Sequence, residues 1–180
     1  TGFIAVHVAM VARSNQLVGA AVDAVEAAER GDIPGLGTAL QSLNAAMTDI
    51  NTAMESMWQF SRTDGYRRFR TFIMGTKGQA AMFPAEGIVY EGIPGPDGRD
   101  LTLACRGESG ANDSIVPLCD NLLGVTAALP ENPLTEILRD FRSYRPKAHT
   151  AFLASIEAAS RNLGIPGLAA QHHRAIYLRC

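Results

Sequence analysis

This sequence has few cysteines, a small net charge and no long apolar run, and each of these features excludes a class of protein. The three cysteines, Cys105, Cys119 and Cys180, form no CxxC pattern and are too few for a disulfide framework, which indicates a reducing cytoplasm. A net charge of −2 with 19% charged residues gives no general attraction to nucleic acid or anionic lipid. Hydrophobic residues make up 47%, but no apolar run approaches the roughly 20 residues that span a bilayer. We therefore expect a cytoplasmic protein that binds neither nucleic acid nor membrane.

The length of 180 residues is enough for one domain with a sizeable core. The chain starts at Thr1 without a methionine, and its last residues, through Cys180, keep a helical pattern without a terminating Gly, Pro or Asn. Both ends therefore predict a fragment of a longer protein. We expect residues 1–180 to form a single helical domain whose site is completed by other segments of the same protein.

Apolar residues recur at helical spacing along most of the chain. One helix is predicted from Gly2 to about Arg30, and a second amphipathic run from Leu36 to Met57 should pack against it as an antiparallel pair. Further helices are predicted over about 66–74, 110–125, from 133 after the N-cap Asn132, over 147–162, and from 166 to the end.

The stretch between about residues 75 and 100 lacks this periodicity. It is rich in Gly, Pro and Asp around a short extended run at residues 87–91, and residues 94–98 predict a turn. Long loops in compact domains are commonly functional covers or binding loops. The expected fold is therefore all-α with one long irregular loop that forms a wall of a site.

The four histidines lack the spacing of a zinc site, because HxxxH, HExxH and CxxC are all missing. His172 and His173 lie in an otherwise apolar final helix, so one of the two imidazoles should face inward. An inward neutral imidazole needs a partner, and haem iron is one. Ser109 is not in a GxSxG motif, which argues against a serine hydrolase.

Arginines and aromatic residues alternate near the third predicted helix. A solvated basic face accounts for Arg67 and Arg68. Arg70 stands one helical turn from Tyr66, so an aromatic surface and a bidentate cation would point the same way. This combination suits a small aromatic carboxylate.

Six segments carry a family pattern in a fixed order. They are GFIAVH at residues 2–7, FRTFIMG at 69–75, GIVYEG at 87–92, GESGANDS at 107–114, RDFRSYRP at 139–146 and AHTAFL at 148–153. In order and spacing they resemble the indoleamine 2,3-dioxygenase family. The resemblance implies an all-helical fold, similar to the large domain of that family, around haem b.

The same resemblance implies roles for individual residues. His173 would be the proximal ligand to the haem iron, and His149 would be structural. Ser109 and Gly110 would lie over the porphyrin edge, beside both cofactor and substrate, where their small size lets the backbone approach the macrocycle.

On the distal side, the resemblance places His7 where family members carry Ser or His, as a catalytic residue. Arg70 would bind the substrate carboxylate, and Phe3 and Tyr66 would flank the indole ring. Gly65 differs from the family pattern, because an aromatic residue is common at that position.

The implied function is insertion of O2 across the C2–C3 bond of L-tryptophan or a related indole, giving an N-formylkynurenine-type product. It requires haem b, O2 and an electron donor that the sequence does not identify. One alternative is a secondary-metabolism haem enzyme that oxidises another indole or a phenol, which Gly65 and Glu108 favour. Another is a haem-binding module without turnover, against which Arg70 and Tyr66 argue.

Overall fold

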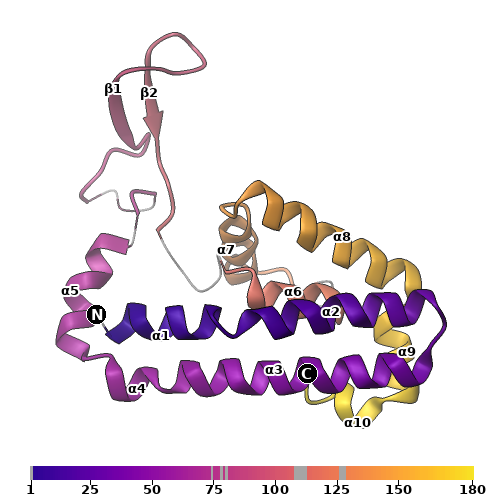
Figure 1. Cartoon of the computed structure of the whole chain (residues 1–180). Helices are drawn as coiled ribbons and strands as arrows, with labels where there is room; N and C mark the ends of the chain where they lie inside the picture. The colour runs from indigo at the N-terminus through magenta and orange to yellow at the C-terminus, as the bar shows by residue number, and fades with distance from the viewer. Residues whose placement is uncertain (1, 74, 78, 80, 108–112, 126–128) are drawn as a thin grey trace.

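Two long helical segments run antiparallel along the molecule (Figure 1). The first consists of α1 (Gly2–Val11) and α2 (Ser14–Glu29), and the second of α3 (Ile33–Glu55) followed by the short α4 (Met57–Phe60). The predicted antiparallel pair is confirmed. The structure is a computed structural model and describes residues 2–73, 75–77, 79, 81–107, 113–125 and 129–180.

The turn between α2 and α3 follows from its residue types. Gly31 adopts a φ of +65°, which favours glycine. The Asp32 side chain then caps α3 by accepting a hydrogen bond from the backbone N–H of Gly35 at 2.9 Å, and Pro34 occupies the first turn. The reversal brings the apolar faces of α2 and α3 together.

The predicted single helix from Gly2 to Arg30 is in fact two helices, α1 and α2. At the break, the Arg13 N–H bonds to the carbonyl of Met10, three residues back, at 3.0 Å. The Ser14 hydroxyl donates to the Val11 carbonyl at 2.7 Å. Such local bonds compete with the regular helix ladder. The apolar spacing continues across the break, so periodicity did not detect it.

Two further helices, α6 (Ile115–Leu122) and α8 (Lys147–Leu163), pack on α2 and on each other, and α7 (Pro133–Arg142) lies between them in sequence. Asn132 caps α7 in a reciprocal capping box, as its residue type predicted. Gly164, with a φ of +66°, ends α8 as predicted.

The C-terminal segment differs from the prediction of one helix running to the end of the chain. It forms α9 (Ile165–His172) and α10 (Arg174–Tyr177), with a break at His173. His173 has φ −134° and ψ 34°, outside the helical range, and its Nε2 lies 2.8 Å from the carbonyl oxygen of Ile33. The side chain therefore contacts the start of α3 from a helix junction.

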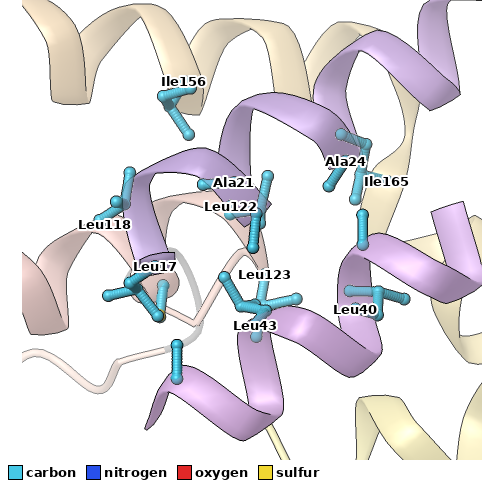
Figure 2. Close-up of a cluster of buried hydrophobic side chains, with 14 of the residues drawn as sticks. Leu17, Ala21, Ala24, Leu40, Leu43, Leu118, Leu122, Leu123, Ile156 and Ile165 are labelled. Carbon is cyan, nitrogen blue, oxygen red and sulfur yellow. The ribbon is translucent and has the colours of Figure 1, made fainter. Parts of the chain in front are cut away.

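The core is aliphatic and lies where α2, α3, α6, α8 and α9 meet (Figure 2). Leu17, Leu40 and Leu122 are fully buried there. Alanines along α2 let the helices approach closely, because a small side chain leaves room for the neighbouring leucines. Burial of this cluster, at about 1.5–3 kcal/mol for each large aliphatic side chain, is the main source of stability.

The segment predicted as an irregular loop contains a β-hairpin that projects beyond α5 (Thr63–Ile73) in Figure 1. Strand β1 (Ile88–Pro94) pairs antiparallel with β2 (Asp100–Leu103), and the predicted turn joins them. All residues of β1 are exposed. The fold is thus mostly helical, as predicted, with one small hairpin. Within the described ranges, no helix is long and apolar enough to cross a membrane.

Candidate functional site

An aromatic cluster joins the start of α1 to α5. The ring centroid of Phe3 lies 4.9 Å from that of Tyr66 and 5.9 Å from that of Phe69. On its own helix, Phe3 lies 4.4 Å from the imidazole of His7. Tilted ring pairs at these distances contribute a favourable interaction energy in addition to that of the apolar area they bury. The structure therefore brings together three predicted site residues: Phe3, His7 and Tyr66.

The close contact between α1 and α4 positions this cluster. A Cβ on Gly2 would lie 1.7 Å from the backbone carbonyl oxygen of Phe60, so no other residue fits without a backbone shift. Because Phe3 follows Gly2 directly, the contact sets the distance between the Phe3 ring and α5.

The cluster lines a cavity of about 350 Å3, which we call the aromatic cavity. Arg70 does not line this cavity but contacts one of its walls, since its Nη1 donates a hydrogen bond to the Tyr66 hydroxyl at 3.0 Å. The two residues are four apart on α5, the spacing that places them on one face. The cavity is lined by Gly2, Phe3, Ile4, Phe60, Ser61, Arg62, Asp64, Gly65, Tyr66 and Phe69.

His7 has a defined tautomer. Its Nδ1 lies 3.0 Å from the carbonyl oxygen of Phe3, and a carbonyl can only accept, so Nδ1 donates the proton. In the neutral ring, Nε2 is then an acceptor. His7 is half-buried and lines a second cavity.

This second cavity, the methionine cavity, has a volume of about 450 Å3. Its apolar walls come from α1, α3, α6 and α7, and its polar members are few. It is lined by His7, Met10, Met47, Ile50, Asn51, Met54, Asp113, Val116, Pro117, Leu138 and Arg142. Apolar walls with a few polar groups are typical of small-molecule and cofactor sites.

A third cavity of about 590 Å3 lies between the start of α2, α6 and the start of α8. Asp113 lines both this cavity and the methionine cavity. His149 is on its wall, with Nδ1 3.0 Å from the Ser114 hydroxyl oxygen. The predicted site residues Ser109 and Gly110 lie outside the described residues, as does Glu108. The next described residue after them is Asp113.

A cluster of charged side chains binds Arg106, which lies shortly before Glu108 in sequence, to α7. Arg106 Nε and Lys77 Nζ both donate to one carboxylate oxygen of Asp140 on α7, the lysine at 3.2 Å. The Arg106 guanidinium also lies over the Phe141 ring, 5.7 Å from its centroid. The hydrogen bonds from Arg106 and then Lys77 lower the pKa of Asp140. Two segments far apart in sequence are therefore tied to α7.

Burial also shifts the pKa of groups near the cavities. The pKa of the Cys119 thiol rises to about 12, first because it is buried and then because Asp120 and Cys180 are near. Burial lowers the pKa of Arg145, whose Nε donates to the Asp113 carbonyl at 3.0 Å. Arg142 pairs with Asp120 beside the methionine cavity. Among the residues that the structure describes, no group of three or more His, Cys, Asp or Glu side chains is arranged for a metal ion.

His173 is not brought to these cavities. Its ring packs over Gly37, where an added Cβ would lie 2.5 Å from the imidazole Cε1. Ile33, its hydrogen-bond partner, precedes Ile50 of the methionine cavity by 17 residues on α3, about 25 Å along the helix axis. His7 and His173 thus lie near opposite ends of α3.

The methionine cavity contains residues that sequence reasoning did not assign to the site, among them Met54, Val116 and Arg142. Apolar residues at helical spacing look the same in sequence whether they face a packed core or a cavity. A cluster of methionines, which adapt to irregular surfaces, was the available signal.

Comparisons with known proteins identify the family of this chain. The family model described as indoleamine 2,3-dioxygenase matches residues 1–174. An indoleamine 2,3-dioxygenase of Penicillium citrinum is 27% identical over 159 residues, which cover 88% of this chain and 35% of that protein. Indoleamine 2,3-dioxygenase 1 of Rattus norvegicus is 29% identical over 159 residues, covering 88% and 37%. The chain therefore spans little more than a third of the length of these relatives.

Proposed function

Since this chain belongs to the indoleamine 2,3-dioxygenase family, we propose that it supplies helical walls of a haem site for the oxidation of an indole. The proposed reaction inserts both atoms of O2 across the C2–C3 bond of L-tryptophan or a related indole, giving an N-formylkynurenine-type product. One observation carries the proposal: Tyr66 contacts both the Phe3 ring and the Arg70 guanidinium. His7, which stacks on Phe3, connects this cluster to the methionine cavity.

The apolar lining around His7 supports a porphyrin site in this proposal. The methionine cavity and the third cavity share Asp113 and are mostly apolar, which suits a large flat hydrophobic ring. Met10, Met54 and Val116 would contact such a ring on the His7 side. Haem b, when bound, supplies the iron that activates O2. The apolar walls would keep water away from the reacting ring.

His173 as the residue that would hold the haem iron is part of the proposal and rests on the sequence prediction alone. The Nε2 atom that would bind iron contacts the Ile33 carbonyl, so ligation requires that the segment from α9 onward leave the start of α3. A test follows from this requirement. Haem titration of His173→Ala and His7→Ala, followed by absorption spectroscopy, is expected to show loss of haem only in His173→Ala. Loss only in His7→Ala would reverse the assignment of the two faces.

The chain's own residues bind and orient the substrate. Tyr66 and Phe3 offer aromatic faces for the indole, and Arg70 offers two parallel N–H donors for a carboxylate. His7 Nε2, an acceptor in the neutral ring, can take a hydrogen bond from the indole N–H. These contacts hold the substrate in one orientation, which is the main requirement when the cofactor supplies the chemistry.

The proposal includes partners outside this chain. Because the chain spans little more than a third of its relatives, other segments of a longer protein would complete the site. An electron donor would keep the iron reduced.

Gly65 favours a second candidate of the same family, oxidation of a different indole in secondary metabolism. It lies on the aromatic cavity, and a Cβ there would meet nothing within 4 Å. Product analysis with tryptophan separates the two reactions. The Arg70 contact with Tyr66 argues against a haem-binding module without turnover, because carrying haem does not need a carboxylate site.

Arg70 provides the sharpest test. We expect Arg70→Ala to weaken L-tryptophan binding by about 10- to 100-fold in calorimetry, less than for a buried partner because Arg70 is exposed. Arg70→Lys should recover little, since an ammonium lacks the bidentate fork. Arg67→Ala, an exposed neighbour on α5, is the matched control.

Indole, which has no carboxylate, should bind wild type and Arg70→Ala equally. If L-tryptophan affinity survives Arg70→Ala within about twofold, the amino-acid substrate loses its main support and the second candidate takes precedence.

A further inference from the structure

Helix α7 borders the methionine cavity although it contributes no side chain to the aliphatic core. Of its ten residues, all of which the structure describes, Thr135 is the only one that is buried, and its hydroxyl donates to the Pro130 carbonyl beside the helix cap. Leu138 and Arg142, four residues apart and therefore on one face, line the cavity. Arg142 also pairs with Asp120 on α6. Polar contacts are therefore important in holding this wall of the cavity in place.

The opposite face of α7 carries Asp140. This residue is two positions from both Leu138 and Arg142, so at about 100° per residue it lies about 160° around the helix from each. Its carboxylate accepts hydrogen bonds from Lys77 Nζ at 3.2 Å and from Arg106 Nε. Two cations that share one carboxylate form a network, which stabilises more than an isolated exposed pair does. One face of α7 thus lines the cavity, while the other is held by charge.

The two cations belong to the segments that lead into and out of the β-hairpin, residues 75–77 and 105–106, which we call the hairpin base. The N–H groups of Thr76 and Lys77 both donate to the Cys105 carbonyl, at 2.8 and 2.9 Å. The Cys105 N–H donates in return to the Thr76 hydroxyl at 3.0 Å. Neither of these two described segments lines the methionine cavity. The carboxylate on α7 therefore joins a paired backbone segment outside the cavity to a helix that forms one of its walls.

Building on the proposed function, we propose that Asp140 is a positioning residue for the methionine cavity. By holding the outer face of α7 on the hairpin base, it fixes the position of Leu138 and Arg142 on the inner face. Because one helix carries both faces, a group that fills the cavity and steadies α7 also steadies the hairpin base, and the coupling acts equally in the other direction. Asp140 does not line the cavity, so its role is not catalytic.

The first test needs no ligand. Hydrogen exchange followed by mass spectrometry compares wild type with Asp140→Asn, which keeps the size of the side chain and removes its charge. We expect exchange about 3- to 10-fold faster in α7 and the hairpin base, with α2 and α8 unchanged, because local opening depends on the contacts of each segment. Asp140→Glu, which keeps the carboxylate, should restore most of the protection. Glu157→Gln, which breaks an exposed ion pair with Arg161 within α8, is the matched control and should leave α7 and the hairpin base unchanged.

The second test adds haemin. At saturating haemin, exchange in wild type should slow both in α7 and in the hairpin base. Absorption titration of Asp140→Asn should show haemin binding about 3- to 10-fold more weakly, and saturating haemin should then protect α7 without protecting the hairpin base. Loss of this coupling is a result that general destabilisation would not produce.

Two results would overturn the role of Asp140 while the proposed function stands. One is unchanged exchange of α7 in Asp140→Asn without ligand, and the other is equal protection of the hairpin base by haemin in wild type and Asp140→Asn. If wild type takes up no haemin, the proposed function is overturned, and the comparison without ligand alone decides whether Asp140 positions α7.

Discussion

The two halves of α3 face different surroundings. In the N-terminal half, Leu36, Leu40 and Leu43 are completely buried in the aliphatic core, and the His173 ring packs against Gly37. In the C-terminal half, Met47 and Met54 are half-buried on the methionine cavity. One helix thus carries both a closely packed surface and a surface beside open volume.

The difference shows how one amphipathic helix can stabilise the fold with one half and line a cavity with the other. Branched aliphatic side chains with few rotamers specify a unique packing, whereas methionines adapt to an irregular partner. Helix α3 packs against α2, α9 and α10, and its C-terminal half lines the methionine cavity. Substitutions in the two halves should therefore have different consequences.

The largest expected effect is on stability at the packed half. Leu40→Ala should lower the free energy of unfolding by about 2–5 kcal/mol, because it removes buried methyl groups and leaves a cavity. Met54→Ala, which already borders open volume, should cost about 1 kcal/mol or less. Urea denaturation of both variants measures the difference. Equal losses would remove the distinction between the two halves.

A smaller loss is expected at the junction of α3 with the C-terminal segment. Gly37→Ala would normally favour a helix, but here the new Cβ would lie 2.5 Å from His173 Cε1, so we expect destabilisation by about 1–3 kcal/mol. Gly19→Ala, without such a neighbour, should be neutral or stabilising in the same denaturation assay. A stabilised Gly37→Ala would mean that the ring does not stay over α3.

The ionic cluster at Asp140, outside the packed core, predicts that the stability of the protein depends on pH in acid. Its pKa is lower in the folded protein than in the unfolded chain, so the unfolded state binds more protons in acid. The stabilising contribution is therefore complete above about pH 4 and is lost as the pH falls through the folded pKa. Between pH 6 and pH 3, wild type should lose more stability than Asp140→Asn, whereas Glu157→Gln should follow wild type. Parallel curves for wild type and Asp140→Asn would contradict a role for the cluster.

The smallest effect concerns cysteine reactivity and should leave the fold unchanged. With a pKa of about 12 and a buried side chain, Cys119 should resist iodoacetamide at pH 8. Exposed Cys105 should react first, and half-buried Cys180, whose pKa is also raised by burial, more slowly. Mass spectrometry of digested protein gives the order. Early labelling of Cys119 would indicate that the core opens readily.

Much of this fold was predictable because its signals are local. The helical spacing predicted α3 and α8, and the cap residues Asn132 and Gly164 marked helix ends correctly. The breaks at Arg13 and His173 were missed, because each depends on hydrogen bonds that interrupt a run of continuous apolar spacing. The extended run predicted at residues 87–91 overlaps β1, but its pairing with β2 was not predicted, because the exposed strands lack the alternation of a half-buried sheet.

The candidate site was predictable in part. The spacing of Tyr66 and Arg70 predicted that they share one face of a helix, and their hydrogen bond agrees with this. The family resemblance, confirmed by the match over residues 1–174, placed Phe3 and Tyr66 around one substrate ring, and the two side-chain rings lie 4.9 Å apart. The position of His173 depends on how the C-terminal segment meets the start of α3. Contacts of that range, between residues 140 apart, have no local signature.

The break after α1 has a consequence for exchange of amide protons with solvent. Helix α2 is locked into the aliphatic core, whereas α1 buries only Val6 and Met10 and exposes Ile4, Val8 and Val11. The free energy needed to open a helix locally increases with the apolar surface that the helix buries. Protection of backbone amides from hydrogen exchange should therefore be much lower in α1, before Arg13, than in α2. The helix that carries Phe3 and His7 can then open without unfolding the domain. Hydrogen exchange in α1 can therefore be used to detect binding. A ligand in the aromatic cavity or the methionine cavity would slow amide exchange in α1 and leave exchange in α2 unchanged.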